Sequence, residues 1–88
     1  MIPAVLAFKP GVTLTAEGDA VCLTMGQRIR CAQNARQALL LKALKRGSQS
    51  PESLAALLRE SREAPEDDTQ AALIIAAFIL DFGDYLEA

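Results

Sequence analysis

The feature that most constrains this chain is a stretch near its C-terminal end, TQAALIIAAFIL, which contains no charged residue. It runs from Thr69 to Leu80, and only its first two residues are polar. A helix on the surface of a small protein normally carries a polar face, and this segment has none. Its apolar part has only about half the length that a helix needs to cross a bilayer. We therefore expect a helix with apolar contacts on more than one side and no membrane span.

Helical periodicity divides this segment into two unlike sides. The bulky side, which we expect to pack on the other helices, contains Ala71, Ile74, Ile75, Phe78 and Phe82. The opposite side is shallow but also apolar, and consists of Leu73, Ala76 and Leu80, flanked by Ala72 and Ala77. Three explanations remain open for the shallow side. The sheet of the same domain covers it, a second copy packs on it, or it lines a groove for a peptide.

The rest of the chain changes from a strand pattern to a helical one. Short runs bounded by turn residues predict an antiparallel meander with strands at 12–15, 20–25 and 28–32. Helical spacing predicts two helices, at 34–47 and 50–61, with Asn34 and Ser50 as their N-caps. The third helix is expected from Asp67 or Asp68 to Asp81 or Phe82, before Gly83, and the final DYLEA is expected to be a tail. The predicted fold class is α+β, as a small winged-helix-like single domain over 1–88, with a three-stranded antiparallel sheet followed by three helices.

The second hairpin has two possible registers. A two-residue turn at Gly26-Gln27 suits a type II′ turn and places Cys22 opposite Cys31, close enough for a disulfide, but it puts Arg28 and Arg30 on the same face as Leu23. A three-residue loop instead places Val21, Leu23, Ile29 and Cys31 on one face. A shift of one residue exchanges the two faces of a strand. Apolar patterning favours the second register, in which the two cysteines are reduced and unpaired.

Composition removes several classes of function. The 88 residues include no histidine and only two cysteines, and no Gly-rich phosphate loop is present. We therefore expect no enzymatic activity, no metal site and no cofactor. The charge is divided, because residues 1–46 carry seven basic and two acidic side chains whereas residues 66–88 carry six acidic and no basic ones. Since a recognition helix needs basic and polar side chains, the third helix does not predict nucleic-acid binding. The first residues, MIPAVLAFKPG, lack the pattern of a secretory signal, so we expect a cytoplasmic, soluble protein.

The order of elements resembles a known family. The segment VTLTAEGDAVCLTMGQRIRCAQNARQALLLKALKRGSQSPESLAALLRE and the closing helix AALIIAAFILDFGDYL are similar to the small protein D of pyrroloquinoline quinone biosynthesis and its relatives. These proteins include the leader-binding elements of lasso peptide systems. The resemblance covers about Gly11 to Leu86 and rests on layout more than on invariant residues.

This resemblance implies a non-catalytic domain that binds the leader region of a ribosomally made precursor peptide. The leader adds as a strand to the third strand and packs on the last helix, and the domain delivers it to a modifying enzyme such as a leader peptidase or a radical enzyme. The implied peptide-binding residues are Arg28, Ile29, Arg30, Cys31, Leu73, Ala76, Ala77 and Leu80, with the two arginines facing acidic leader residues. The alternatives are a winged-helix DNA-binding regulator and a structural dimerisation domain that uses the third helix.

Overall fold

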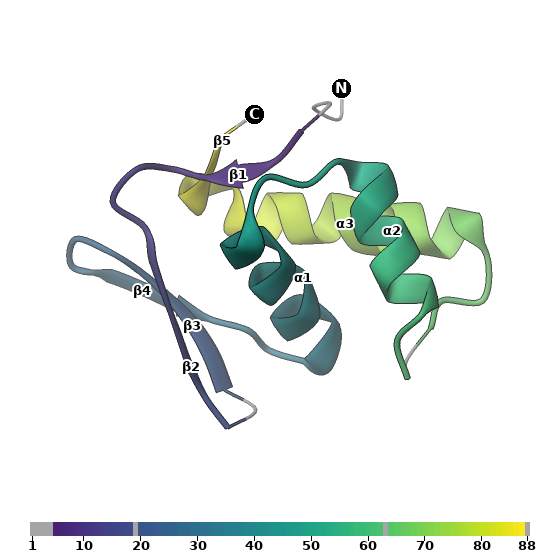
Figure 1. Cartoon of the computed structure of the whole chain (residues 1–88), viewed down its shortest axis with the longest axis horizontal. Helices are drawn as coiled ribbons and strands as arrows, with labels where there is room; N and C mark the ends of the chain where they lie inside the picture. The colour runs from purple at the N-terminus through teal and green to yellow at the C-terminus, as the bar shows by residue number, and fades with distance from the viewer. Residues whose placement is uncertain (1–4, 19, 63, 88) are drawn as a thin grey trace.

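The computed structural model in Figure 1 describes residues 5–18, 20–62 and 64–87. It contains a three-stranded antiparallel sheet that three helices follow along the chain. The predicted α+β class is confirmed. The strands of this sheet are β2 (Thr13–Glu17), β3 (Ala20–Met25) and β4 (Arg28–Cys31). The helices are α1 (Ala35–Arg46), α2 (Pro51–Arg59) and α3 (Asp68–Phe82). A short strand β1 (Ala7–Phe8) precedes them, and a 3₁₀ turn η1 (Gly83–Tyr85) and a strand β5 (Leu86–Glu87) follow them.

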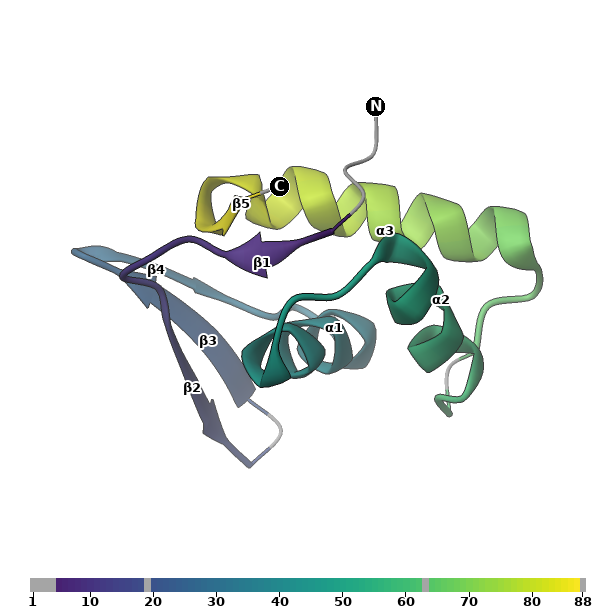
Figure 2. The same cartoon turned by 45° about the horizontal axis from the view of Figure 1, so that its top comes forward.

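Helix α1 lies between the sheet and α2 (Figure 1), and α3 runs across both helices with its C-terminal end near β4 (Figure 2). Its inner side is fully buried at Leu40, Leu41 and Ala43, while Val21 and Leu23 of β3 are buried from the sheet side. Leu54 and Leu58 close the core from α2. Among the described residues no helix is long and apolar enough to cross a membrane.

The capping residues begin the three helices where the sequence predicts. The side-chain oxygen of Asn34 accepts a hydrogen bond from the Gln37 amide at 2.9 Å, and Ser50 Oγ accepts one from the Ser53 amide at 3.1 Å. Asp67 accepts from the Gln70 amide at 2.8 Å at the start of α3. These bonds satisfy amides that have no partner within a helix.

Helix α3 buries the side that its periodicity predicts. Its buried residues are Ala71, Ile75, Phe78 and Phe82, and the rings of the two phenylalanines lie 5.2 Å apart. On the opposite side, Leu73 is 65% exposed and Leu80 is 84% exposed. The sheet of the same domain therefore does not cover the shallow side, which leaves a second copy or a peptide among the three explanations.

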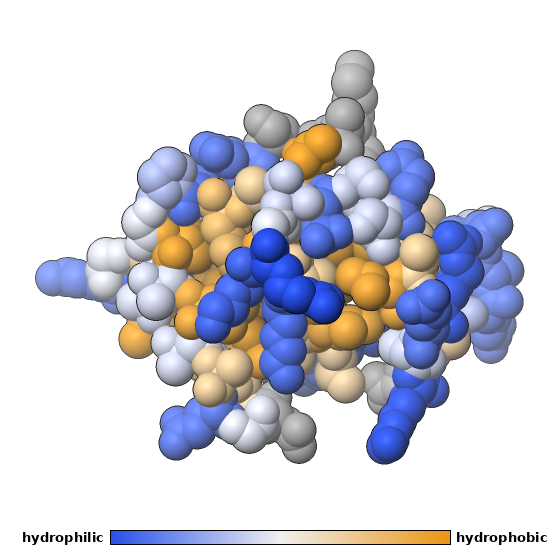
Figure 3. Space-filling model, viewed as in Figure 1, coloured by the Kyte–Doolittle hydropathy of each residue, from blue (hydrophilic) through white to orange (hydrophobic). Residues whose placement is uncertain are grey.

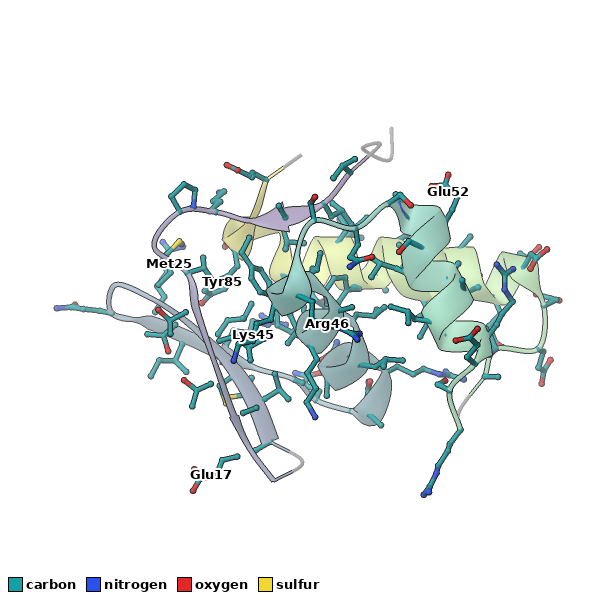
Figure 4. All side chains as sticks on the ribbon, in the orientation of Figure 1. Glu17, Met25, Lys45, Arg46, Glu52 and Tyr85 are labelled. Carbon is teal, nitrogen blue, oxygen red and sulfur yellow. A yellow bond between two sulfur atoms is a disulfide. The ribbon has the colours of Figure 1, made fainter. Side chains whose placement is uncertain are left out.

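The C-terminal DYLEA segment is not a free tail, so that prediction is wrong. Tyr85 and Leu86 are buried, and β5 pairs with β1 so that Phe8 lies opposite Leu86. Tyr85 belongs to the apolar core and Met25 packs against that core, and both side chains lie toward the left of Figure 4. The prediction failed because β1, the partner strand, is only two residues long and lies in a segment to which the sequence assigned no element.

The favoured register of the second hairpin is also wrong. Met25 lies opposite Arg28 and Cys22 opposite Cys31, and the two cysteines form a disulfide rather than remaining reduced and unpaired. Gly26 has φ +61° and no described non-glycine residue has a positive φ, which matches a two-residue type II′ turn. Turn geometry and the covalent bond therefore override apolar patterning, and Arg28 and Arg30 lie on the same face as Leu23.

The two sides of α3 predict different costs of substitution. Phe78→Ala is expected to lower the free energy of unfolding by about 3–5 kcal/mol, because its ring is 1% exposed and its loss leaves a cavity. Leu80→Ala, on the exposed side of the same helix, is the matched control and should change it by less than about 0.5 kcal/mol. Urea denaturation measures both. Equal losses for the two variants would contradict the orientation of α3.

Candidate functional site

Strand β4 has one free edge in the described structure. The sheet order is β2-β3-β4, so β3 is its only neighbour there. The Ala32 amide donates to the Val21 carbonyl at 2.8 Å, which identifies these opposite residues as a hydrogen-bonded pair. Because such pairs alternate along an antiparallel ladder, Arg28 and Arg30 direct their main-chain groups toward β3. Ile29 and Cys31 therefore direct theirs toward the free edge, where another strand can bond to them.

The inward side chains of β4 reach the C-terminal end of α3. The Arg30 guanidinium lies 5.3 Å from the centre of the Phe82 ring and 3.8 Å from the Asp81 carboxylate. Arg28 lies 3.7 Å from Asp84, one turn further along. These ion pairs are partly to largely exposed, so each contributes at most about 1 kcal/mol. The arginines cover apolar surface with their stems while their charged ends remain hydrated.

Asp81 is the residue that joins three elements at this point. One of its carboxylate oxygens faces Arg30 of β4, and the other accepts a hydrogen bond from the Gln37 side chain of α1 at 3.1 Å. A single carboxylate on α3 therefore connects the sheet, through Arg30 of β4, to α1, through Gln37.

A hollow of about 250 Å³ lies beside Asp81, between α1 and α3. Its polar rim includes Arg36, Gln37 and Asp81, and its apolar lining includes Leu40, Ile74, Ala77 and Phe78. It also reaches Gln33 and Asn34, which are separated from the end of β4 by Ala32 alone. The hollow therefore lies near the C-terminal end of β4 and provides an apolar recess there.

The predicted site residues fall into two groups. Four of them lie on β4, where Ile29 and Cys31 present the free main-chain edge and Arg28 and Arg30 face α3. On α3, Ala77 lines the hollow, whereas Leu73, Ala76 and Leu80 do not. Only one of the four predicted α3 residues is therefore brought together with the strand edge.

Sequence reasoning missed Gln37, Ile74 and Asp81 as members of this site. Ile74 was assigned to the core side of the helix, and the structure leaves it half-buried in the wall of the hollow. The sequence does contain one pattern that indicates a role for Asp81. Two arginines at strand spacing match two aspartates, Asp81 and Asp84, at helical spacing in a chain whose basic and acidic residues are segregated.

The face drawn in Figure 3 mixes apolar and hydrophilic areas. Hydrophilic side chains over α1 interrupt its apolar areas. Lys45 and Arg46 belong to the last turn of α1 and are exposed (Figure 4). Positive charge at this position stabilises a helix C-terminus. Within residues 5–18, 20–62 and 64–87, no three His, Cys, Asp or Glu side chains are placed to hold a metal ion.

Comparison with known proteins adds no assignment. No protein-family model matches the chain, and a search of curated proteins gives no match.

The bridging role of Asp81 can be measured against Asp84. Asp81→Ala removes the acceptor for Gln37 and the partner of Arg30, so we expect the free energy of unfolding to fall by about 1 kcal/mol. Asp84→Ala removes one ion pair whose two side chains are 67% and 81% exposed, and should change it by less than about 0.5 kcal/mol. Denaturation of the two variants at low and high salt measures the difference. A loss for Asp84→Ala as large as that for Asp81→Ala would contradict the three-element role of Asp81.

Proposed function

We propose that this domain binds an extended peptide, the leader region of a ribosomally made precursor, by strand addition at the free edge of β4. The bound leader is then delivered to a modifying enzyme, such as a leader peptidase or a radical enzyme. The observation that carries the proposal is the juxtaposition of the free β4 edge with the hollow beside α3. The resemblance in layout likewise implies strand addition to β4 and packing on α3, but of the four α3 residues that it implies only Ala77 lines the hollow.

Main-chain geometry supports the first part of this proposal. A peptide strand beside β4 would bond to the outward groups of Ile29 and Cys31, since strand addition derives affinity from main-chain hydrogen bonds. Residues directly opposite one another share a face of a sheet. The peptide residue opposite Arg30 therefore points to the inner face, toward α3.

The composition of the recess indicates which peptide side chain fits. Its lining at Ile74, Ala77 and Phe78 is apolar, so a small or medium apolar side chain would enter it with favourable burial. Arg28 and Arg30 are already paired with Asp84 and Asp81. An acidic leader residue that pairs with Arg28 or Arg30 would therefore compete with one of these aspartates. The apolar side chain that enters the recess therefore determines the register of the peptide along β4 more strongly than charge does.

Titration of isotope-labelled protein with a synthetic leader peptide encoded beside its own gene tests the proposal. We expect amide shifts at Ile29 and Cys31, and side-chain shifts at Ile74 and Ala77, because these groups meet the added strand. Ala77→Arg should fill the recess and weaken binding by about tenfold or more, which corresponds to about 1.4 kcal/mol.

Ala72→Arg is the matched control. Ala72 is an exposed alanine of the same helix that does not line the hollow, so this variant should bind as the parent does. Shifts confined to residues outside β4 and α3, or equal weakening by both variants, would overturn the site.

Dimerisation through α3 is a second candidate, favoured by the exposure of Leu73 and Leu80. Exposed leucines on one helix side form an apolar strip of the kind that a second copy covers. Sedimentation velocity decides this point. If α3 forms the contact, the parent chain sediments as a dimer and Leu80→Asp as a monomer, with unchanged folding because the residue lies away from Phe78. A parent monomer at high micromolar concentration would remove this candidate.

A further inference from the structure

Two pairings of β4 with β3 compete for the same residues. In the observed one, Ile29 is 69% exposed while Arg30 lies on the core side opposite Leu23. A shift of one residue would place Ile29 opposite Leu23 on the core side and turn Arg28 and Arg30 to the outer face. The shifted pairing follows the apolar pattern of the sequence better than the observed pairing does.

The disulfide is compatible with only one of these pairings. It joins Cys22 to Cys31, which lie directly opposite one another with their Cα atoms 3.9 Å apart. After a shift of one residue, Cys22 would face Arg30, and the two cysteine side chains would lie on opposite faces of the sheet. A bond between them is then geometrically impossible. The other contacts that depend on the observed pairing are the two exposed arginine ion pairs and the contact of Arg30 with the Phe82 ring, and each of them is weak.

We propose that the Cys22–Cys31 disulfide is a redox-controlled lock on the β3–β4 pairing, which a dithiol reductant opens so that β4 shifts by one residue. A reductant thiolate attacks Sγ of Cys31, the exposed member of the pair, and displaces the Cys22 thiolate. The second reductant thiol then attacks the mixed disulfide and releases Cys31. The reductant leaves as a disulfide, and the domain gains two electrons and two protons as two thiols.

The cytoplasmic location that the sequence predicts would supply reductants for this exchange. Cytoplasmic glutathione and thioredoxin keep most protein thiols reduced, and disulfides found there are usually transient or redox-sensing. Cys31 is exposed and Cys22 is half-buried on the sheet face opposite the buried Leu23, so a reductant reaches them without unfolding the core.

The shift changes the edge that β4 presents. In the shifted pairing, Ile29 and Cys31 bond to β3, and the main-chain groups of Arg28 and Arg30 point outward instead. Arg30 also leaves Asp81 and the Phe82 ring. The consequence for peptide binding rests on the proposed function, whereas the shift itself does not, and it is measured without any peptide.

Proton NMR of the full-length labelled chain, oxidised and then reduced with dithiothreitol, tests the lock. Close Hα–Hα contacts mark the pairs that lack hydrogen bonds. We expect contacts of Cys22 with Cys31 and of Thr24 with Ile29 in the oxidised chain. After reduction they should be replaced by contacts of Cys22 with Arg30 and of Thr24 with Arg28. Amide exchange should slow at Ile29 and quicken at Arg30, each by about tenfold or more.

Two variants complete the test. The double variant Cys22→Ala/Cys31→Ala should show the shifted contacts without any reductant. Ile29→Thr removes the apolar side chain that gains from the shift, so its reduced form should keep the original contacts. A reduced parent chain that keeps the Cys22–Cys31 contact would overturn the proposal. So would a general loss of spectral dispersion on reduction, because the disulfide would then be needed for folding itself, and so would an equal shift in Ile29→Thr.

Discussion

The pairing of β4 with β3 determines the face on which every side chain of β4 lies, and the open side of the domain depends on it. With Cys22 opposite Cys31, Arg30 faces inward, covers the Phe82 ring and meets Asp81. Asp81 in turn accepts a hydrogen bond from Gln37 of α1. This chain of contacts connects the sheet edge to α3 through side chains. The shifted pairing would remove both arginines from it, so the side-chain contact between β4 and α3 follows from a single choice of register.

The free energies that decide this register are similar in size. Burying Ile29 would gain about 1–2 kcal/mol for the apolar surface that it now exposes. The Arg30 contact with Phe82 is worth about 0.5–1 kcal/mol at a partly exposed site, and each exposed ion pair about 0–1 kcal/mol. The gain and the loss are similar in size, and the shift would also turn the exposed Cys31 to the inner face, which favours the shifted pairing once the disulfide is open. A disulfide closing a loop of this length, with a sequence separation of 9, contributes about 2–3 kcal/mol against the unfolded chain. It also excludes the shifted pairing altogether, so the covalent bond decides the outcome.

Local signals explain which parts of the fold were predictable. Asn34, Ser50 and Asp67 cap the helices as expected, because a cap depends on residues within one turn. Helical periodicity predicted the buried side of α3 correctly for the same reason. The register of β4 against β3, and the site between β4 and α3, depend instead on residues that lie far apart in the chain. Arg30 is stabilised on the inner face by residues about fifty positions later, and β5 needs β1 at the other end of the chain. No local pattern contains this information.

The apolar stretch from Thr69 to Leu80 therefore has three sides rather than two. One side forms the core through Ile75 and Phe78, and a flank at Ile74 and Ala77 lines the recess next to β4. The third side, with Leu73 and Leu80, is open. A single strand added to β4 reaches the flank but leaves the open side uncovered, since those leucines do not line the recess. If the domain binds a leader as proposed, the leader alone does not account for these leucines. In that case the two leucines would be free to contact a larger surface, either a second copy of this chain or the enzyme that would receive the peptide.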